Sequence, residues 1–292
     1  MPQQPLGEVF CFPITNHSED ATRNRAMRLC PFNNKVANCT KDKANNPLGV
    51  CGVYEGESVT ITCPIRFREK WRIATDASTF FFPEGTKSTS LVEVKLKDRD
   101  GKSAGNIDVV LVSYDDEGKL LDFGSLEVQA VYISGNVRGP FSYFMEDPPN
   151  RSDMIWKGKA KYPRADFLSS SRKRLAPQLL FKGGILHSWK KKQAVAIDRA
   201  FFNTLPQLIA VPVEEAELAW FVYDLVRDDA RDLYELQLVD TVYTRFEPAM
   251  ETLTTAKPGA VEDFIGTLQS KLDEKLEGTE PEAVALDDVI LT

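Results

Sequence analysis

The chain has 292 residues, of which 42% are hydrophobic and 27% are charged, a composition typical of folded globular proteins. Its two histidines, His17 and His187, argue against a histidine-rich metal site, and the absence of a long apolar run or a signal-peptide pattern predicts a cytosolic protein with no membrane partner. The net charge of −7 conceals a basic block, because residues 151–200 hold thirteen Lys and Arg against three Asp and Glu.

The first seventy residues contain every cysteine of the chain. Ser18 is a good N-cap and predicts a short helix that runs to about Leu29. Residues 30–51 are rich in Asn, Pro and Gly, which is typical of a loop that buries little apolar area. Such a segment needs another stabiliser, and thiolates bound to a metal ion are the candidate.

The last four cysteines are spaced Cys30-x8-Cys39-x11-Cys51-x11-Cys63, without the short knuckle of common zinc fingers. Proline follows both Cys30 and Cys63, and the loop-rich context favours a tetrathiolate site that holds zinc or iron in a structural role. Cys11 is then a spare thiol. The alternative interpretation is a set of scattered buried cysteines.

The stretch from residue 90 to residue 132 is expected to form three strands. Apolar, β-branched runs separated by turns with Asp and Gly are typical of a β-meander. Each run contains one acid, namely Glu93, Asp108 or Glu127, and an acid in such a run is costly unless it is paired or bound to a cation. The predicted strands are residues 91–96, 106–112 and 125–132, with turns at 98–101 and 115–118.

The remaining elements surround the basic block. A helix is expected from Asp166 to about Leu175, interrupted near Pro177 because proline breaks helical hydrogen bonding. An acidic tail is expected from Gly278. The other predicted elements are a strand at 193–197, a pair of strands at 218–226 and 233–243, and a helix at 261–276.

The acids of the meander suggest a catalytic metal site. Asp108 is followed, after eighteen residues, by Glu127-Val128-Gln129, which is the spacing of the PD-(D/E)XK nuclease core. Acids on two hairpin strands can hold Mg²⁺, and the Val128 carbonyl could add a ligand. Strand alternation puts Glu127 and Gln129 on one face. Gln129 stands where the pattern usually has Lys and supplies no charge, so Glu93 is the acid expected to compensate.

Two other interpretations of these acids remain open. Asp76 followed by Glu93-Val94-Lys95 contains a literal E-x-K and is as good by spacing alone. The acids could also be solvent-facing residues on ordinary strands, because short patterns of this kind are frequent by chance.

Taken together, the cysteine contexts and the acidic hairpin resemble the NotI-like type II restriction endonucleases. The resemblance rests on Leu29-Cys30-Pro31-Phe32, Cys39-Thr40-Lys41, Gly49-Val50-Cys51, Cys63-Pro64-Ile65-Arg66, Ile107-Asp108 and Leu126-Glu127-Val128-Gln129. It covers residues 29–66 and 106–136, and it is weak or absent over the last hundred residues.

The resemblance implies an α/β (α+β) fold with a PD-(D/E)XK core, in which helices flank a mixed sheet, and an N-terminal four-cysteine segment that holds iron. It implies that Asp108, Glu127 and Gln129 form the Mg²⁺-dependent catalytic site, with Glu93 as an upstream acid and Lys95 as a bystander. It also implies a homodimer that cuts duplex DNA at a palindromic site.

The expected domains are a four-cysteine metal-binding segment at 1–70 packed on the core, a nuclease core at 71–276 with a basic DNA-binding region at 151–200, and an acidic tail at 277–292. The expected phosphate contacts are Lys157, Lys159, Lys161, Arg172, Lys173 and Arg174. The alternative function is a non-catalytic DNA-binding or defence-associated module with a structural metal ion held by the four cysteines.

Overall fold

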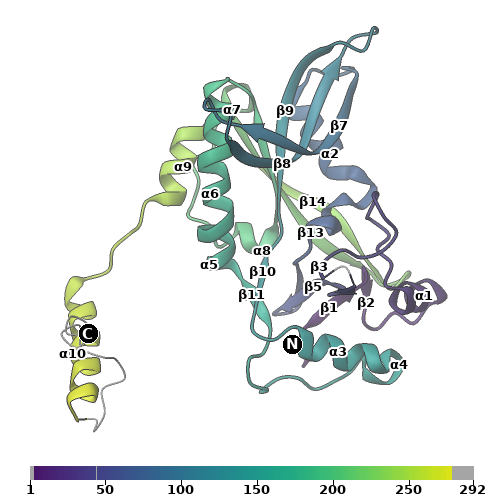
Figure 1. Cartoon of the computed structure of the whole chain (residues 1–292), viewed down its shortest axis with the longest axis vertical. Helices are drawn as coiled ribbons and strands as arrows, with labels where there is room; N and C mark the ends of the chain where they lie inside the picture. Colours follow the sequence, from purple (N-terminus) through teal and green to yellow (C-terminus); the bar gives the residue numbers. More distant parts are fainter. Residues whose placement is uncertain (1–2, 44, 278–292) are drawn as a thin grey trace, which may run out of the picture. The chain divides into compact units, whose positions relative to one another are not determined.

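The computed structural model, which describes residues 3–43 and 45–277, is built on a six-stranded mixed sheet in the order β14-β13-β12-β9-β8-β7 (Figure 1). β12 runs parallel to both of its neighbours, and the other neighbouring pairs are antiparallel. The predicted meander, the buried strand and the hairpin are thereby confirmed. The strands are β7 (Ser88–Lys97), β8 (Ser103–Tyr114), β9 (Leu120–Gln129), β12 (Gln193–Asp198), β13 (Leu218–Asp228) and β14 (Leu233–Thr244).

Helices cover both faces of this sheet, so the predicted α/β class is confirmed. Along β12, Ala194 and Ala196 belong to the apolar cluster that includes α2 (Arg72–Phe81), whereas Val195 and Ile197 pack in the cluster on the opposite face. α8 (Arg199–Phe202) and α9 (Phe246–Thr254) also contribute to that second cluster.

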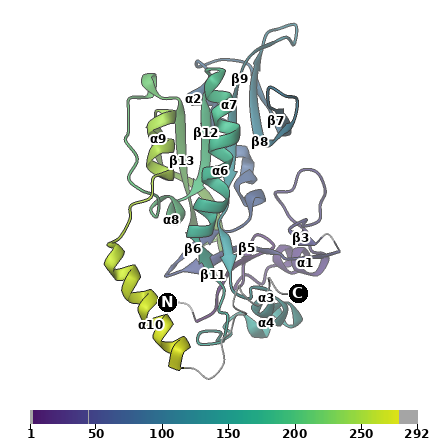
Figure 2. The same ribbon diagram turned by 60° about the vertical axis from the view of Figure 1, so that its left-hand side comes forward.

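A continuous helix from residue 167 to residue 188 crosses the second face (Figure 2). The expected interruption near Pro177 is therefore wrong. Two π-helical turns flank the proline, and their wider spacing relieves the clash and the lost hydrogen bond that proline imposes on an α-helix. The segments are α5 (Phe167–Ser170), η2 (Ser171–Leu175), α6 (Ala176–Gln178), η3 (Leu179–Gly183) and α7 (Gly184–Ser188).

The N-terminal residues form a second, four-stranded sheet in the order β2-β1-β5-β6, which the sequence patterns did not predict. α1 (Glu19–Met27) confirms the predicted helix, because the Ser18 hydroxyl accepts the Ala21 N–H. The strands are β1 (Leu6–Val9), β2 (Phe12–Pro13), β5 (Val50–Glu55) and β6 (Ser58–Ile61), with a small β3 (Asp42–Lys43) and β4 (Asn46–Pro47) ribbon.

A buried arginine ties this sheet to the central one. Arg66, in the short helix η1 (Pro64–Trp71), donates to Glu8 at 2.8 Å, to Glu69 at 2.6 Å and to the Tyr234 carbonyl at 2.7 Å. The three side chains are almost fully buried, and the guanidinium also lies over the Phe32 ring of the cysteine loop. This buried charged cluster thus joins the N-terminal sheet and the cysteine loop to β14.

The remaining elements are short, apart from one helix in a separate unit. They are β10 (Tyr132–Ser134), α3 (Arg138–Glu146), α4 (Pro148–Arg151), β11 (Arg164–Asp166) and η4 (Val213–Glu215). The chain divides into Met1–Leu253 and Thr254–Thr292. The second unit contains α10 (Val261–Glu277), which confirms the helix predicted at 261–276. The acidic tail expected from Gly278 lies outside the described residues. Across the described ranges, no helix is long and apolar enough to cross a membrane.

Candidate active site and nucleic-acid interface

The strands β8 and β9 separate at the predicted acid pair. Their antiparallel ladder ends at the pair Val109–Leu126, so Asp108 and Glu127 are the next residues in register. β9 continues beyond this point beside β12, where Glu127 aligns with Val195. Asp108 Oδ2 accepts a hydrogen bond from the Val128 N–H at 2.8 Å. This side-chain bond stands where a backbone hydrogen bond would otherwise continue the β8–β9 ladder. The fold therefore holds the Asp108 carboxylate directly beside the Glu127 strand.

The two carboxylates are close enough to affect each other. Burial is the largest of the effects that together raise the pKa of Glu127 to about 7; the nearby Asp108 carboxylate also raises this pKa, whereas the Lys182 ammonium lowers it. Glu127 Oε1 is buried and has no hydrogen-bond partner in the described part of the chain. An orphaned carboxylate oxygen beside a second carboxylate is the ligand chemistry that Mg²⁺ prefers, so these residues fit a divalent cation.

Lys182 is a residue of this site that the sequence patterns missed. Its Nζ atom lies 2.6 Å from Glu127 Oε2 and 2.9 Å from the Asn106 carbonyl oxygen, and the residue is 5% exposed. The signal was present, because Lys182 interrupts the apolar stripe formed by Leu179 and Leu186 on the inner face of the long helix. A lysine in such a stripe requires a buried partner.

Gln129 lies two residues beyond Glu127, aligned with Ile197 on β12, which agrees with the predicted common face. The side chain is 4% exposed, and its Nε2 donates to the Ala130 carbonyl at 2.9 Å. Gln129 is therefore a buried polar neighbour of the acid pair, without a charge of its own.

Glu93 points to a different partner. The residue has a left-handed backbone (φ 55°), and its carboxylate accepts from Lys35 of the cysteine loop at 2.5 Å on a half-exposed surface. Lys35 holds the pKa of Glu93 below its usual value. The rival acid Asp76 lies on α2, where it accepts from the Tyr223 hydroxyl at 2.7 Å, and Lys95 is exposed on β7.

All five cysteines are buried. The Sγ atoms of Cys11 and Cys51 lie 3.4 Å apart. Hydrogen bonds from Cys11 and Cys63 lower the pKa of Cys51, and one from Cys11 lowers the pKa of Cys30. Burial raises the pKa of Cys39 to about 11.

These contacts form a sulfur-rich centre in which Cys11, expected to be spare, touches other cysteines. Among the residues that the structure describes, no group of three or more His, Cys, Asp or Glu side chains is arranged to hold a metal ion. The chemistry of the donors nevertheless suits a thiophilic metal such as zinc or iron, because thiolates are the ligands that such metals favour.

The six basic residues expected to contact phosphates are all exposed, three on the loop before β11 and three on η2. Lys159 lies 3.9 Å from the centre of the Trp156 ring. Arg174 lies 4.6 Å from the centre of the Tyr132 ring. Tyr132 is the first residue of β10 and follows Gln129 by three residues. One basic side chain is thereby fixed close to the end of β9, the strand that carries Glu127.

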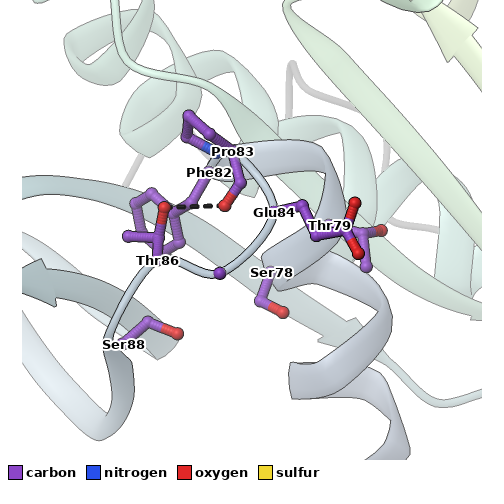
Figure 3. A pocket seen from close by; sticks show the side chains of 8 residues that line it. Ser78, Thr79, Phe82, Pro83, Glu84, Thr86 and Ser88 are labelled. Carbon is purple, nitrogen blue, oxygen red and sulfur yellow. Dashed lines mark hydrogen bonds between the residues drawn. The ribbon is translucent and has the colours of Figure 1, made fainter.

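A pocket of about 370 Å³ lies at the end of α2, away from these residues in the chain (Figure 3). Hydroxyl-bearing and apolar side chains line it, and the Thr86 hydroxyl donates to the Pro83 carbonyl at 2.6 Å. Its lining includes Ser78, Thr79, Phe82 and Glu84 and contains none of the predicted site residues.

Comparison with known proteins identifies a family that the chain matches. The model of a protein family described as Restriction endonuclease NotI matches residues 9–236, which is more than half of the chain. The matched range contains the cysteine-rich segment, the acid pair and the basic residues. A search of curated proteins finds no match to the chain.

Proposed function

The chain belongs to the NotI restriction endonuclease family, and we propose that it is a type II enzyme that hydrolyses duplex DNA at a palindromic site with the help of Mg²⁺. The observation that carries this proposal is the acid pair, in which Asp108 and Glu127 are consecutive in register where β8 and β9 separate. The unpartnered Glu127 Oε1 supports a divalent cation there.

Asp108, Glu127 and the Val128 carbonyl would hold this cation. When bound, it would stabilise the charge of the phosphate and lower the pKa of a bound water. The chain's own residues prepare the site. The Val128 N–H binds Asp108 Oδ2, so Oδ1 is the oxygen that would bind the cation. Gln129 is the residue proposed to orient the attacking water, and Glu93, which is paired with Lys35, is proposed as the upstream acid.

The DNA duplex is proposed to lie across the basic loop before β11 and the basic turn η2. Phosphate contacts position a protein on DNA, and lysines and arginines on one surface provide them. Two copies of the chain, related by a two-fold axis, would match the symmetry of a palindromic site.

A structural zinc or iron ion is proposed to bind the thiolates of Cys30, Cys39, Cys51 and Cys63. The support is the sulfur-rich centre, in which the Sγ atoms of Cys11 and Cys51 lie 3.4 Å apart and hydrogen bonds from Cys11 and Cys63 lower the pKa of Cys51. Four thiolates leave no open position, so this ion would stabilise the fold of the cysteine-rich segment rather than take part in hydrolysis.

Digestion of plasmid DNA with Mg²⁺ tests the proposal. The parent protein is expected to release discrete fragments whose sequenced ends share one palindrome, and Asp108→Asn is expected to bind the same DNA without cutting it. The matched control, Asp100→Asn in an exposed turn, should cut normally. If the parent binds DNA in a salt-dependent way, without needing Mg²⁺, and never cuts it, the non-catalytic binding module becomes the better description.

A further inference from the structure

Lys182 is held rigidly at the acid pair by its helix. It belongs to the π-helical turn η3, and such turns occur frequently at functional sites. The next residue, Gly183, packs so closely on β12 that an added Cβ would lie 2.8 Å from Gln193 Oε1. Gln193 Nε2 also donates to the Gly183 carbonyl at 2.9 Å. The position of Lys182 is thus set by direct contact between the helix and the central strand.

The path of the side chain is equally constrained. The Lys182 stem passes over Gly105, where an added Cβ would lie 3.5 Å from Cδ and where the backbone has a φ of 112°. The ammonium then bonds the Asn106 carbonyl and Glu127, so it touches both strands that lead to the acid pair. In the described ranges these two bonds use two of its three donors.

The charge at this place complements the sequence motif. The Glu127-Val128-Gln129 segment has an amide where a lysine would provide a cation, and the ammonium of Lys182 lies against Glu127 instead. The ammonium binds Oε2, and Oε1 has no partner among the described residues. Oε1 is therefore the Glu127 oxygen available to a cation, next to the Asp108 carboxylate.

We propose that Lys182 is the positioning residue of this site: it neutralises Glu127 until a divalent cation arrives and then holds the carboxylate with Oε1 directed to that cation. It thereby provides, from a helix, the positive charge that Gln129 lacks. The expected effect of Lys182 on cleavage rests on the proposed nuclease function. Its expected effect on cation binding does not.

The proposal makes opposite predictions for binding and for cleavage. An ammonium beside Glu127 repels a divalent cation and competes with it for the carboxylate, so its removal strengthens cation binding. The same removal frees the carboxylate to turn and takes away a charge near the reacting phosphate, so cleavage becomes slower. A purely structural lysine would weaken both.

The test compares Lys182→Met with Lys87→Met, which removes another lysine of an ion pair, the one with Asp116. Ca²⁺ is titrated calorimetrically into each DNA-free protein at pH 8.5, and cleavage is measured with Mg²⁺. K182M is expected to bind Ca²⁺ about threefold tighter or better and to cut roughly 100-fold slower, while K87M matches the parent. Should K182M not fold, Lys182→Gln, which keeps a polar contact with Asn106, provides the same two measurements.

A second variant tests whether the positive charge of Lys182 is what supports cleavage. Gln129→Lys added to K182M returns an ammonium to the same face and is expected to recover cleavage by about tenfold. Weaker Ca²⁺ binding by the folded K182M protein, or K182M cleavage equal to that of a parent protein that cuts DNA, would overturn the proposal. If the parent protein never cuts DNA but K182M still binds Ca²⁺ more tightly, the nuclease function fails and the role of Lys182 at the cation site stands.

Discussion

At the scale of single residues, Glu127 is the most informative side chain of the molecule. It is nearly buried, it shares its surroundings with Asp108, and one of its oxygens has no partner in the described residues. A carboxylate in such a place is costly for the metal-free protein, because the ionised form loses its hydration. The same features make it a strong ligand once a cation is present.

The raised pKa of Glu127 predicts a pH dependence for Mg²⁺ binding. Its pKa is about 7, so below pH 7 the carboxyl holds a proton that the cation must displace. The apparent affinity should therefore increase by about tenfold per unit up to pH 7 and level off above it. Calorimetric titrations at pH 6, 7 and 8 measure this, and Glu127→Gln should remove both the binding and its pH dependence. An affinity that is equal at pH 6 and pH 8 would contradict the assignment.

The cysteines allow a second test at this scale. Cys39→Ser is expected to lose the bound metal and to melt at a lower temperature than the parent, because thiolate binding is largely folding free energy. Cys11→Ser should keep the metal. Metal analysis, visible absorption and thermal melts distinguish the two variants and also distinguish iron from zinc. A metal that persists in Cys39→Ser and disappears in Cys11→Ser would give the fourth ligand position to Cys11, which touches Cys51.

Sequence patterns identify some of these residues and not others, for a physical reason. Asp108 and Glu127 belong to one hairpin, so their spacing along the chain determines their register. Lys182 reaches Glu127 from a helix 55 residues away, and only the packing of that helix on the sheet brings them together. Local spacing carries no information of that kind.

At the scale of elements, the close packing of the long helix on β12 leads to a prediction. Gly183→Ala places a methyl group 2.8 Å from Gln193 Oε1 and 2.9 Å from Phe246, and is expected to destabilise the protein by about 1–3 kcal/mol. Gly184→Ala is the matched control, since nothing lies within 4 Å of its Cβ. Thermal melts should show a lower midpoint for the first variant alone. Equal midpoints would mean that the helix is free to shift on the sheet.

The same elements show which parts of the fold local sequence patterns can predict. Apolar, β-branched runs and Asp-Gly turns predict the existence of β7, β8 and β9, but the third strand, expected at 125–132, starts at Leu120 and ends at Gln129. The interruption expected near Pro177 is wrong, since π-helical turns let the helix continue. The N-terminal sheet was missed because its strands are short and buried on both sides, so they lack alternation.

At the scale of the whole molecule, the uneven charge decides how an acidic protein can bind DNA. The net charge is −7, but six of the nine exposed basic residues of 151–200 lie on one loop and one helical turn. A local positive surface attracts a polyanion even when the average charge is negative. The acidic C-terminal part of the sequence is then expected to stay away from the DNA.

This charge distribution predicts the salt dependence of DNA binding. Replacing Arg172, Lys173 and Arg174 by Ala should reduce the slope of log K against log salt by about 2.7, if each neutralises one phosphate. Replacing Lys257, Lys271 and Lys275, three exposed lysines of the C-terminal unit, is the control and should leave the slope unchanged. Fluorescence anisotropy over a salt series measures both. Equal slopes for the parent and the first variant would remove η2 from the DNA-binding surface.

The central claim is that Asp108 and Glu127 share one divalent cation, and a crystal structure grown with Mn²⁺ in place of Mg²⁺ tests it most directly. The anomalous difference map is predicted to contain a peak within about 2.3 Å of an Asp108 oxygen and of Glu127 Oε1. Asp108→Asn crystals should lack this peak. A map in which Mn²⁺ binds elsewhere, with both carboxylates unliganded, would contradict the account.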